Sequence, residues 1–345
     1  MRVEAVVRGC GERANVDMSE RRVGARHNGI VAEGGKYDRA AASDEGDLGA
    51  DQLVRICEVL VAAWELDSAE SGNGAVAGSA AALDVASVRE VFPQDMPTNV
   101  EHAHGQMAGD MINAVVLLLR SIVTLLRAEP LITLGIWPLV RAELEYAGRI
   151  TWLLEPLSGG DAGRRRVARG MLEHLSAVQR QRFTAGKWNP AQAAKFKKVR
   201  TEIRSRVTAL FEDVHTPLDA PEKIAEWTIG GEKMVMLGEG VDRFLTLNLT
   251  NGKALYDVLS DNSHPSVISL ALQSFTTVHE GVRITTYPPI PRVLNMQVRL
   301  GCLTLYRSAI TILDYFGHPH PALDLWAAHA PDRWFPAQPS TPPPA

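Results

Sequence analysis

Apolar residues recur at three- and four-residue spacing along most of the chain, which is the period of an α-helix with one buried face. With capping residues and prolines as boundaries, the pattern predicts helices at 51–64, 104–127, 131–154, 164–185, 190–214, 251–264, 266–283 and 293–316, and a shorter, weaker helical segment at 82–91. Alternation typical of a strand is confined to residues 244–249. The sequence therefore predicts an all-α fold, a helical bundle of about eight helices.

The helical pattern does not extend to either end of the chain. Residues 1–50 have no sustained period and residues 336–345 are rich in proline, so we expect disordered termini. Residues 51–335 are predicted to form a single helical domain with its core in 105–320. The helices at 110–127, 131–154 and 293–316 are apolar almost all round, which predicts a central position for them.

Composition bounds the setting of the protein. The chain has 345 residues, of which 46% are hydrophobic, enough to build a substantial core. Residues 111–140 are the most lipophilic, but charges and a proline interrupt them, and no uncharged run reaches the ~18 residues of a membrane span. Residues 1–50 lack the apolar run of a signal peptide. We therefore expect no membrane span.

The three cysteines, Cys10, Cys57 and Cys302, share no short spacing. An odd number without a pattern argues against a disulfide framework and against a zinc site. It favours a reducing environment, and we predict a cytoplasmic protein.

Positive charge is concentrated in residues 164–206, which hold 13 Lys or Arg and two Glu, a net charge of +11, whereas the whole chain carries −4. Such asymmetry favours RNA or another anionic partner. Arg164, Arg165, Arg166 and Arg169 are the candidate nucleic-acid-binding residues. The alternative is a pair of amphipathic helices whose solvated basic faces pack near acidic neighbours.

Five polar residues stand out on otherwise apolar helices. Tyr256, Ser260 and His264 follow at four-residue intervals, which places them within about 80° of one helix face. Arg141 and Glu145 are also four residues apart, and their charges are costly to bury unless they are paired. We expect these two polar faces to meet inside the bundle.

Two interpretations of this cluster stay open. In the structural one, Arg141 and Glu145 form an internal ion pair, and His264 bonds to a carbonyl at a helix end. In the functional one, Arg141 holds a phosphate or carboxylate ligand, and Glu145 orients the imidazole. His264 would then act as general acid or base, with Glu145, Tyr256 and Ser260 as the other catalytic candidates.

The remaining motifs are weaker. Histidines at turns (His102, His104, His318 and His320) lack a cysteine or acidic partner at metal-ligand spacing. The chain also lacks a Walker loop, a nucleophile elbow, a dinucleotide-binding glycine motif and a zinc-protease motif. We predict no metal and no cofactor.

Several short motifs follow one another in a recognisable order: Arg-x-x-x-Glu at 141–145, Trp-Leu-Leu-Glu-Pro at 152–156, an arginine cluster at 164–169, and Tyr-x-x-Leu-Ser-x-x-x-His-Pro at 256–265. This order resembles a family of helical bacterial proteins of unknown function. The resemblance covers roughly residues 105–320. It implies a helical fold and no particular activity.

The helical pattern also resembles, more distantly, the HEPN superfamily, whose ribonuclease members use an Arg-x(4–6)-His motif to cleave RNA without a metal. Residues 169–174 have this spacing, and so do residues 22–27. No arginine lies four to six residues before His264, and a glycine follows Arg169 where such enzymes usually carry a polar residue. These departures count against ribonuclease activity.

Three functions are consistent with the sequence, and whether the protein is an enzyme stays open. The first is a non-enzymatic interaction or ligand-binding protein with a buried polar cluster. The second is a metal-independent, HEPN-like or toxin-type ribonuclease that acts through His264 and contacts phosphates through residues 164–206. The third is a binder of a small anionic ligand at Arg141.

Overall fold

The computed structural model describes residues 47–71, 74–92, 103–157, 159–217, 221–249, 253–263, 271, 274–331 and 334. All belong to one compact unit of the chain, Ser43–Ala345. The described residues form ten α-helices, one 3-10 helix and five short strands. The mostly helical class is confirmed, with ten helices in these residues rather than eight. The ends predicted to be disordered lie almost entirely outside them.

The helices have the following bounds: α2 Ala50–Glu70, α3 Ala80–Val91, α4 Ala103–Arg127, α5 Ile136–Leu154, α6 Ala162–Gly186, α7 Pro190–Leu210, α8 Leu237–Asn248, α9 Lys253–Ser263, α11 Pro291–Phe316 and α12 Pro321–His329. A 3-10 helix, η2, spans Pro221–Glu226. Strands β1 (Val214–His215), β2 (Thr228–Ile229) and β3 (Glu232–Lys233) form a small antiparallel sheet in that order. Strands β4 (Phe275–His279) and β5 (Val282–Thr286) form a separate hairpin.

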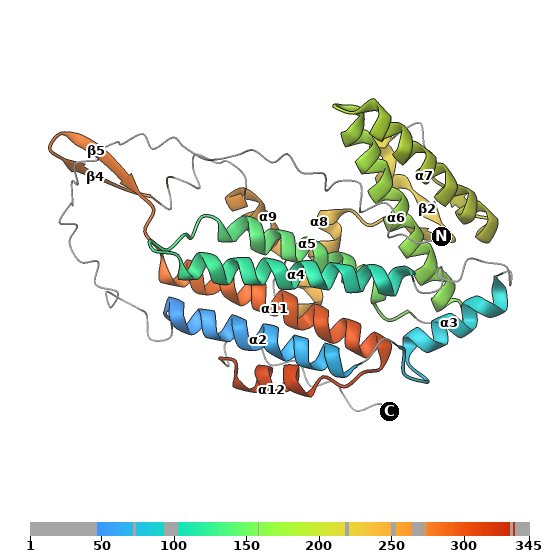
Figure 1. Cartoon of the computed structure of the whole chain (residues 1–345), viewed down its shortest axis with the longest axis horizontal. Helices are drawn as coiled ribbons and strands as arrows, with labels where there is room; N and C mark the ends of the chain where they lie inside the picture. The colour runs from blue at the N-terminus through green and yellow to red at the C-terminus, as the bar shows by residue number, and fades with distance from the viewer. Residues whose placement is uncertain are drawn as a thin grey trace, which may run out of the picture. The chain divides into compact units, whose positions relative to one another are not determined.

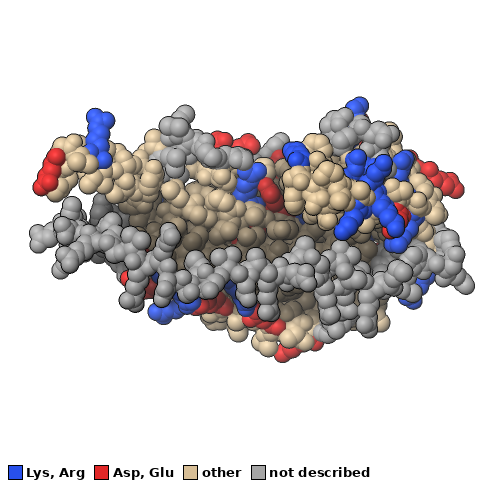
Figure 2. Space-filling model, turned by 45° about the horizontal axis from the view of Figure 1, so that its top comes forward, with Lys and Arg blue, Asp and Glu red and all other residues tan. Residues whose placement is uncertain are grey.

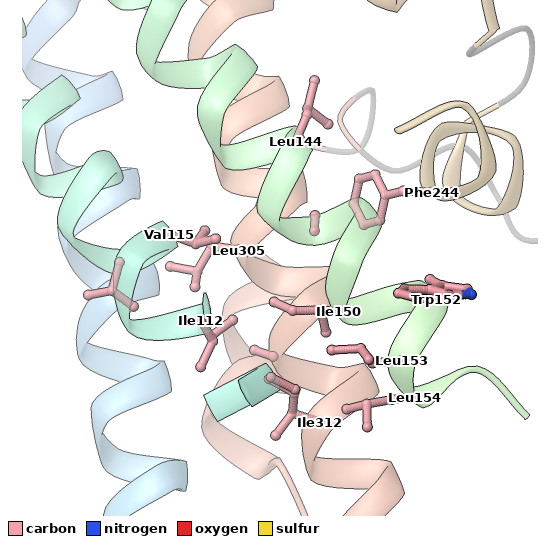
Figure 3. Close-up of a cluster of buried hydrophobic side chains, with 14 of the residues drawn as sticks. Ile112, Val115, Leu144, Ile150, Trp152, Leu153, Leu154, Phe244, Leu305 and Ile312 are labelled. Carbon is pink, nitrogen blue, oxygen red and sulfur yellow. The ribbon is translucent and has the colours of Figure 1, made fainter. Parts of the chain in front are cut away.

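The core lies between α4, α5 and α11, which pack against one another, while α2 covers α4 and α11 (Figure 1). Helices α8 and α9 lie against α5. These central helices carry apolar residues on most of their surface, so each can bury side chains against several neighbours. Figure 3 shows side chains from these helices and α8 meeting in this core: Ile112, Val115, Leu144, Ile150, Phe244, Leu305 and Ile312.

By length and composition alone, α4 could cross a membrane, a test that the core helices of soluble proteins also pass. In the structure it has one buried face, which carries Ile112 and Leu119 among others. On its exposed side, Arg127 Nη2 donates to Glu58 Oε1 of α2 over 2.6 Å, and Arg120 bonds to Glu65. Helix α4 therefore joins the other helices through both apolar packing and surface ion pairs.

Helices α6 and α7 form an antiparallel hairpin beside the bundle (Figure 1). Three residues connect them, and Asn189 caps α7 because its side-chain oxygen accepts from the Gln192 amide over 3.1 Å. Pro190 follows at the first position of the helix, where its fixed φ is favourable. The start of α6 packs on α3 and α4, whereas α7 packs mainly on α6. The hairpin therefore extends from a buried base to an exposed tip.

The helix predicted at 190–214 ends at Leu210, α12 was not predicted, and two further segments have a different secondary structure from the prediction. Residues 244–249 alternate like a strand, but 244–248 form the end of α8, with Leu249 as its C-cap, because Phe244 and Leu245 both face the core. Residues 275–283, predicted as part of a helix, instead form most of the β4–β5 hairpin. Its turn has positive φ at Glu280 (51°) and Gly281 (80°), as a tight two-residue hairpin turn requires. Most flanking residues are β-branched, which favours strands over the predicted helix.

Candidate functional site

The structure brings Arg141 and Glu145 of α5 together with Tyr256 of α9. Arg141 Nε donates to Glu145 Oε1 over 3.0 Å, and the Tyr256 hydroxyl donates to the same oxygen over 3.2 Å. The guanidinium carbon lies 5.7 Å from the centre of the tyrosine ring. The ion-paired side chains are 22% and 24% exposed, so the group lies at the edge of the core. The two polar faces meet through these three residues.

This arrangement satisfies the charge of Arg141 from within the protein. Burial opposes the charged guanidinium, but its bonds to Glu145 and Tyr256 outweigh that effect and raise the pKa of Arg141. Burial and the Glu145 carboxylate raise the pKa of Tyr256, which therefore stays a hydrogen-bond donor. Because the ion pair is neutral overall, it attracts an anion weakly. The geometry fits an internal ion pair better than a phosphate site.

The rest of the expected cluster adds less. Ser260 lies one turn beyond Tyr256 on α9 and is half-buried. His264, the candidate general acid or base, lies outside the described residues. The catalytic roles proposed for His264, Glu145, Tyr256 and Ser260 therefore remain predictions.

The four arginines predicted to contact nucleic acid do not form an exposed face. Arg166 and Arg169 are each 3% exposed, while Arg164 and Arg165 are half-buried. Arg169 Nε donates to Glu232 Oε2 over 2.6 Å, and Arg165 Nε donates to the other oxygen of the same carboxylate over 2.5 Å. Burial and internal pairing leave Arg166 and Arg169 unable to contact a phosphate backbone in this conformation.

The exposed cations of this segment lie further along, at the end of α6 and on α7. We define the basic hairpin surface as Arg180, Lys187, Lys195, Lys197, Lys198 and Arg206, all of which are exposed. Among the residues that the structure describes, none of the six forms an ion pair with a carboxylate. Figure 2 shows Lys and Arg side chains gathered at the end of the view where α6 and α7 lie.

A second polar group, fully inside the protein, surrounds Asp84 of α3. Arg166 Nη1 lies 2.8 Å from both carboxylate oxygens, and the Tyr315 hydroxyl donates to Oδ2 over 2.9 Å. His104 Nε2 lies 2.6 Å from the Tyr315 oxygen. Because that hydroxyl gives its proton to Asp84, its oxygen accepts from His104, which places a proton on Nε2. These four residues, the Asp84 network, are each at most 5% exposed.

A glycine allows the helices of this network to approach. A Cβ atom at Gly163 would lie 2.4 Å from Ser87 Oγ and 2.7 Å from the Asp84 carbonyl oxygen, so a larger residue would push α6 away from α3. Arg166 follows Gly163 by about one turn and reaches Asp84 across this contact. Arg166 Nη2 also donates to the Glu155 carbonyl over 3.0 Å, which ties α6 to the end of α5.

The Asp84 network is charged and internally satisfied. Burial alone would raise the pKa of Asp84, but the bonds from His104 and Tyr315 and the charge of Arg166 outweigh it and lower that pKa. Burial and the Asp84 carboxylate raise the pKa of Tyr315, so the phenol remains protonated. An ionised acid paired with arginine and a protonated phenol hold four helices together, and neither is available as a base near neutral pH.

Two cavities flank this network. One, of about 580 Å³, is lined by Asp84, Arg166 and Tyr315 among mainly apolar and small residues. The other, of about 450 Å³, is lined by His104, Tyr315 and Phe316 among others. Because the polar groups at their walls already bond to one another, the cavities offer mainly apolar surface to a ligand.

The buried thiols form a further close contact that cysteine spacing did not predict. Cys57 Sγ of α2 lies 3.6 Å from Cys302 Sγ of α11, and both are free cysteines.

The Glu143 carboxyl is also fully buried, and burial raises its pKa well above the usual value. Within the described residues, no group of three or more His, Cys, Asp or Glu could hold a metal ion.

Comparison of the chain with protein-family models, with curated proteins and with solved structures found no match. The resemblance to a helical bacterial family therefore remains a prediction.

Sequence reasoning missed the Asp84 network. The sequence predicts His104 at a turn, whereas it lies in the first turn of α4 and is 1% exposed. Asp84 and Tyr315 are separated by 231 residues, and no local pattern reports that contact. The available signal was an aspartate inside the short apolar helix 82–91, which needs a partner if that helix is buried.

Proposed function

We propose that the protein is a non-enzymatic interaction protein that binds an anionic macromolecule through the basic hairpin surface. The observation that carries this proposal is the set of six exposed cations on the α6–α7 hairpin that have no carboxylate partner among the described residues. Helix α7 alone carries six Lys or Arg and one Glu, a net charge of +5. Because the whole chain carries a net charge of −4, the positive charge is a local feature of this helix.

Unpaired surface cations differ physically from the paired arginines at the base of the hairpin. The surface cations have no internal ion pair to break before they contact a partner. When they bind a polyanion, they release counterions from it. A buried arginine bonded to a carboxylate would first have to break that bond. We therefore expect the partner to contact the exposed cations further along the segment, and not residues 164–169.

A salt series with charge variants tests this proposal. The variant Lys195→Glu/Lys197→Glu/Lys198→Glu should bind inorganic polyphosphate and single-stranded RNA at least roughly 10-fold more weakly at about 50 mM salt. For RNA, the slope of log affinity against log salt should become less steep by roughly 0.7 for each phosphate that the variant no longer neutralises. Fluorescence anisotropy of labelled polymers measures both quantities.

A control variant with the same change of charge is Arg55→Glu/Arg283→Glu/Arg292→Glu, whose three exposed cations lie on α2, β5 and α11. It changes the net charge by the same amount but should keep most of the affinity, because its three cations lie outside the α6–α7 hairpin. Equal losses in both variants would reduce the effect to net charge and contradict the proposal. So would the absence of binding to either polymer at low salt.

The other two functions have less support. The ribonuclease hypothesis depends on His264, which the structure does not describe. The small-anion hypothesis depends on Arg141, whose charge is balanced by Glu145. No observation in the structure favours either hypothesis over binding at the basic hairpin surface.

A further inference from the structure

Trp188 is exposed in a chain that buries its other tryptophans. It is 72% exposed, whereas each of the remaining six is at most 8% exposed: Trp64, Trp137, Trp152, Trp227, Trp326 and Trp334. Burial of so large a side chain is favourable, so Trp188 keeps an unusually large apolar surface available for a contact. Its position, between α6 and α7, is the tip of the basic hairpin.

Backbone hydrogen bonds define the turn at the tip. The Trp188 amide donates to the Ala185 carbonyl over 3.1 Å, and the Asn189 amide donates to the same oxygen over 2.7 Å. Phe183, one turn before the end of α6, is 56% exposed, and Lys187 Nζ lies 4.9 Å from the centre of its ring. Two exposed aromatic rings therefore lie beside Lys187 at a hydrogen-bonded turn, so the backbone that carries them needs no ordering when a partner binds.

We infer that the partner of this surface is single-stranded nucleic acid, whose unpaired bases stack on Trp188 and Phe183 while its phosphates contact the lysines of α7. This inference rests on the proposed function and adds the chemical class of the partner. Exposed aromatic rings beside a cationic track are the combination by which proteins hold single strands without reading their sequence. A base pair within a duplex has no free face to offer, so duplexes should bind more weakly.

The exposed side of α7 favours this partner over a membrane surface. A helix that lies in a bilayer interface presents a continuous apolar face to the acyl chains. The exposed positions of α7 are instead lysine, arginine, threonine, serine, alanine, glutamate and Pro190, with Val199 as the one large aliphatic residue, 40% exposed. A purely electrostatic partner, such as polyphosphate, would leave the two rings without a role.

Affinities of the full chain for four probes test the inference: single-stranded RNA, DNA of the same sequence, the RNA duplex and inorganic polyphosphate. Trp188→Ala should weaken binding of the single strands roughly 5- to 150-fold and leave polyphosphate binding unchanged. Trp188→Phe should retain most of the affinity because it keeps an aromatic face. Leu325→Ala, which truncates another exposed apolar residue on α12, is the matched control and should change nothing.

The outcomes separate the inference from the proposed function. If single strands and polyphosphate bind equally well to Trp188→Ala and to the unchanged protein, the electrostatic function stands and the stacking inference is overturned. If none of the probes binds at low salt, both fall. Binding to vesicles containing phosphatidylserine that requires Trp188, without Trp188-dependent binding of single strands, would also overturn the inference.

Discussion

The base and the tip of the α6–α7 hairpin use the same kinds of residue in opposite ways. At the base, Arg166 and Arg169 are buried and bond to Asp84 and Glu232. Toward the tip and along α7, cations such as Lys197 stay in solvent without a carboxylate partner among the described residues. A run of positive charge in a sequence is therefore not one feature, because its members divide between holding the fold and facing outward.

The difference follows from the neighbours of each part. The base packs against α3 and α4, so its side chains leave water and require counter-charges. The tip has few neighbours, and its side chains stay solvated without that penalty. Substitutions at the base should consequently affect stability, and those at the tip should affect binding.

The largest effect is expected for the Asp84 network. Asp84→Asn leaves the Arg166 guanidinium buried without its counter-charge, which should cost about 3–5 kcal/mol of unfolding free energy. Lys197→Ala, at an exposed position, should change it by less than about 0.5 kcal/mol. Denaturant unfolding of both variants measures the contrast, and similar losses in the two would remove the distinction between base and tip.

The same carboxylate predicts a dependence on pH. Because the folded pKa of Asp84 lies below its ordinary value of 3.8, the ionised group stabilises the folded state above that pH. This contribution should disappear as pH falls through the folded pKa, where the folded protein must also take up the proton. In Asp84→Asn, the unfolding free energy should fall less as the pH is lowered through this range. If the unfolding free energies of the variant and the unchanged protein depended on pH in the same way, the assignment would be contradicted.

A smaller effect is expected at the half-exposed pair on α5. Arg141→Ala removes the bonds of the guanidinium to Glu145 and Tyr256, which water already screens, so it should cost about 0.5–1 kcal/mol. Denaturant unfolding again measures the loss. If Arg141→Ala destabilised the protein as much as Asp84→Asn, the α5–α9 pair would have to be regarded as part of the buried framework.

Much of the fold could be predicted because helical periodicity is local. The central helices and the hairpin of α6 and α7 follow directly from apolar spacing, Pro190 and Asn189. The β4–β5 hairpin was missed because residues 266–283 were predicted as one helix, although β-branched residues and a Glu-Gly turn favour strands there. Local rules succeed where one face of a segment is buried, and β4 and β5 are exposed on both faces.

The candidate sites were less predictable because their contacts join distant parts of the chain. The pairing of Glu145 with Tyr256 was expected from two polar faces that each needed a partner. The contact between His104 and Tyr315 spans 211 residues and had no such signal on either side. Nor could the exposure of Trp188 be foreseen, since composition shows only that a tryptophan lies in a basic segment.

The central claim is that Trp188 lies in solvent in the free protein and against a base in the complex. Quenching of tryptophan fluorescence by acrylamide tests it directly, because Trp188 is the one highly exposed tryptophan of seven. We predict an accessible component that is absent in Trp188→Phe and that single-stranded RNA protects at saturation. Unchanged quenching of this component in saturating RNA would contradict the account.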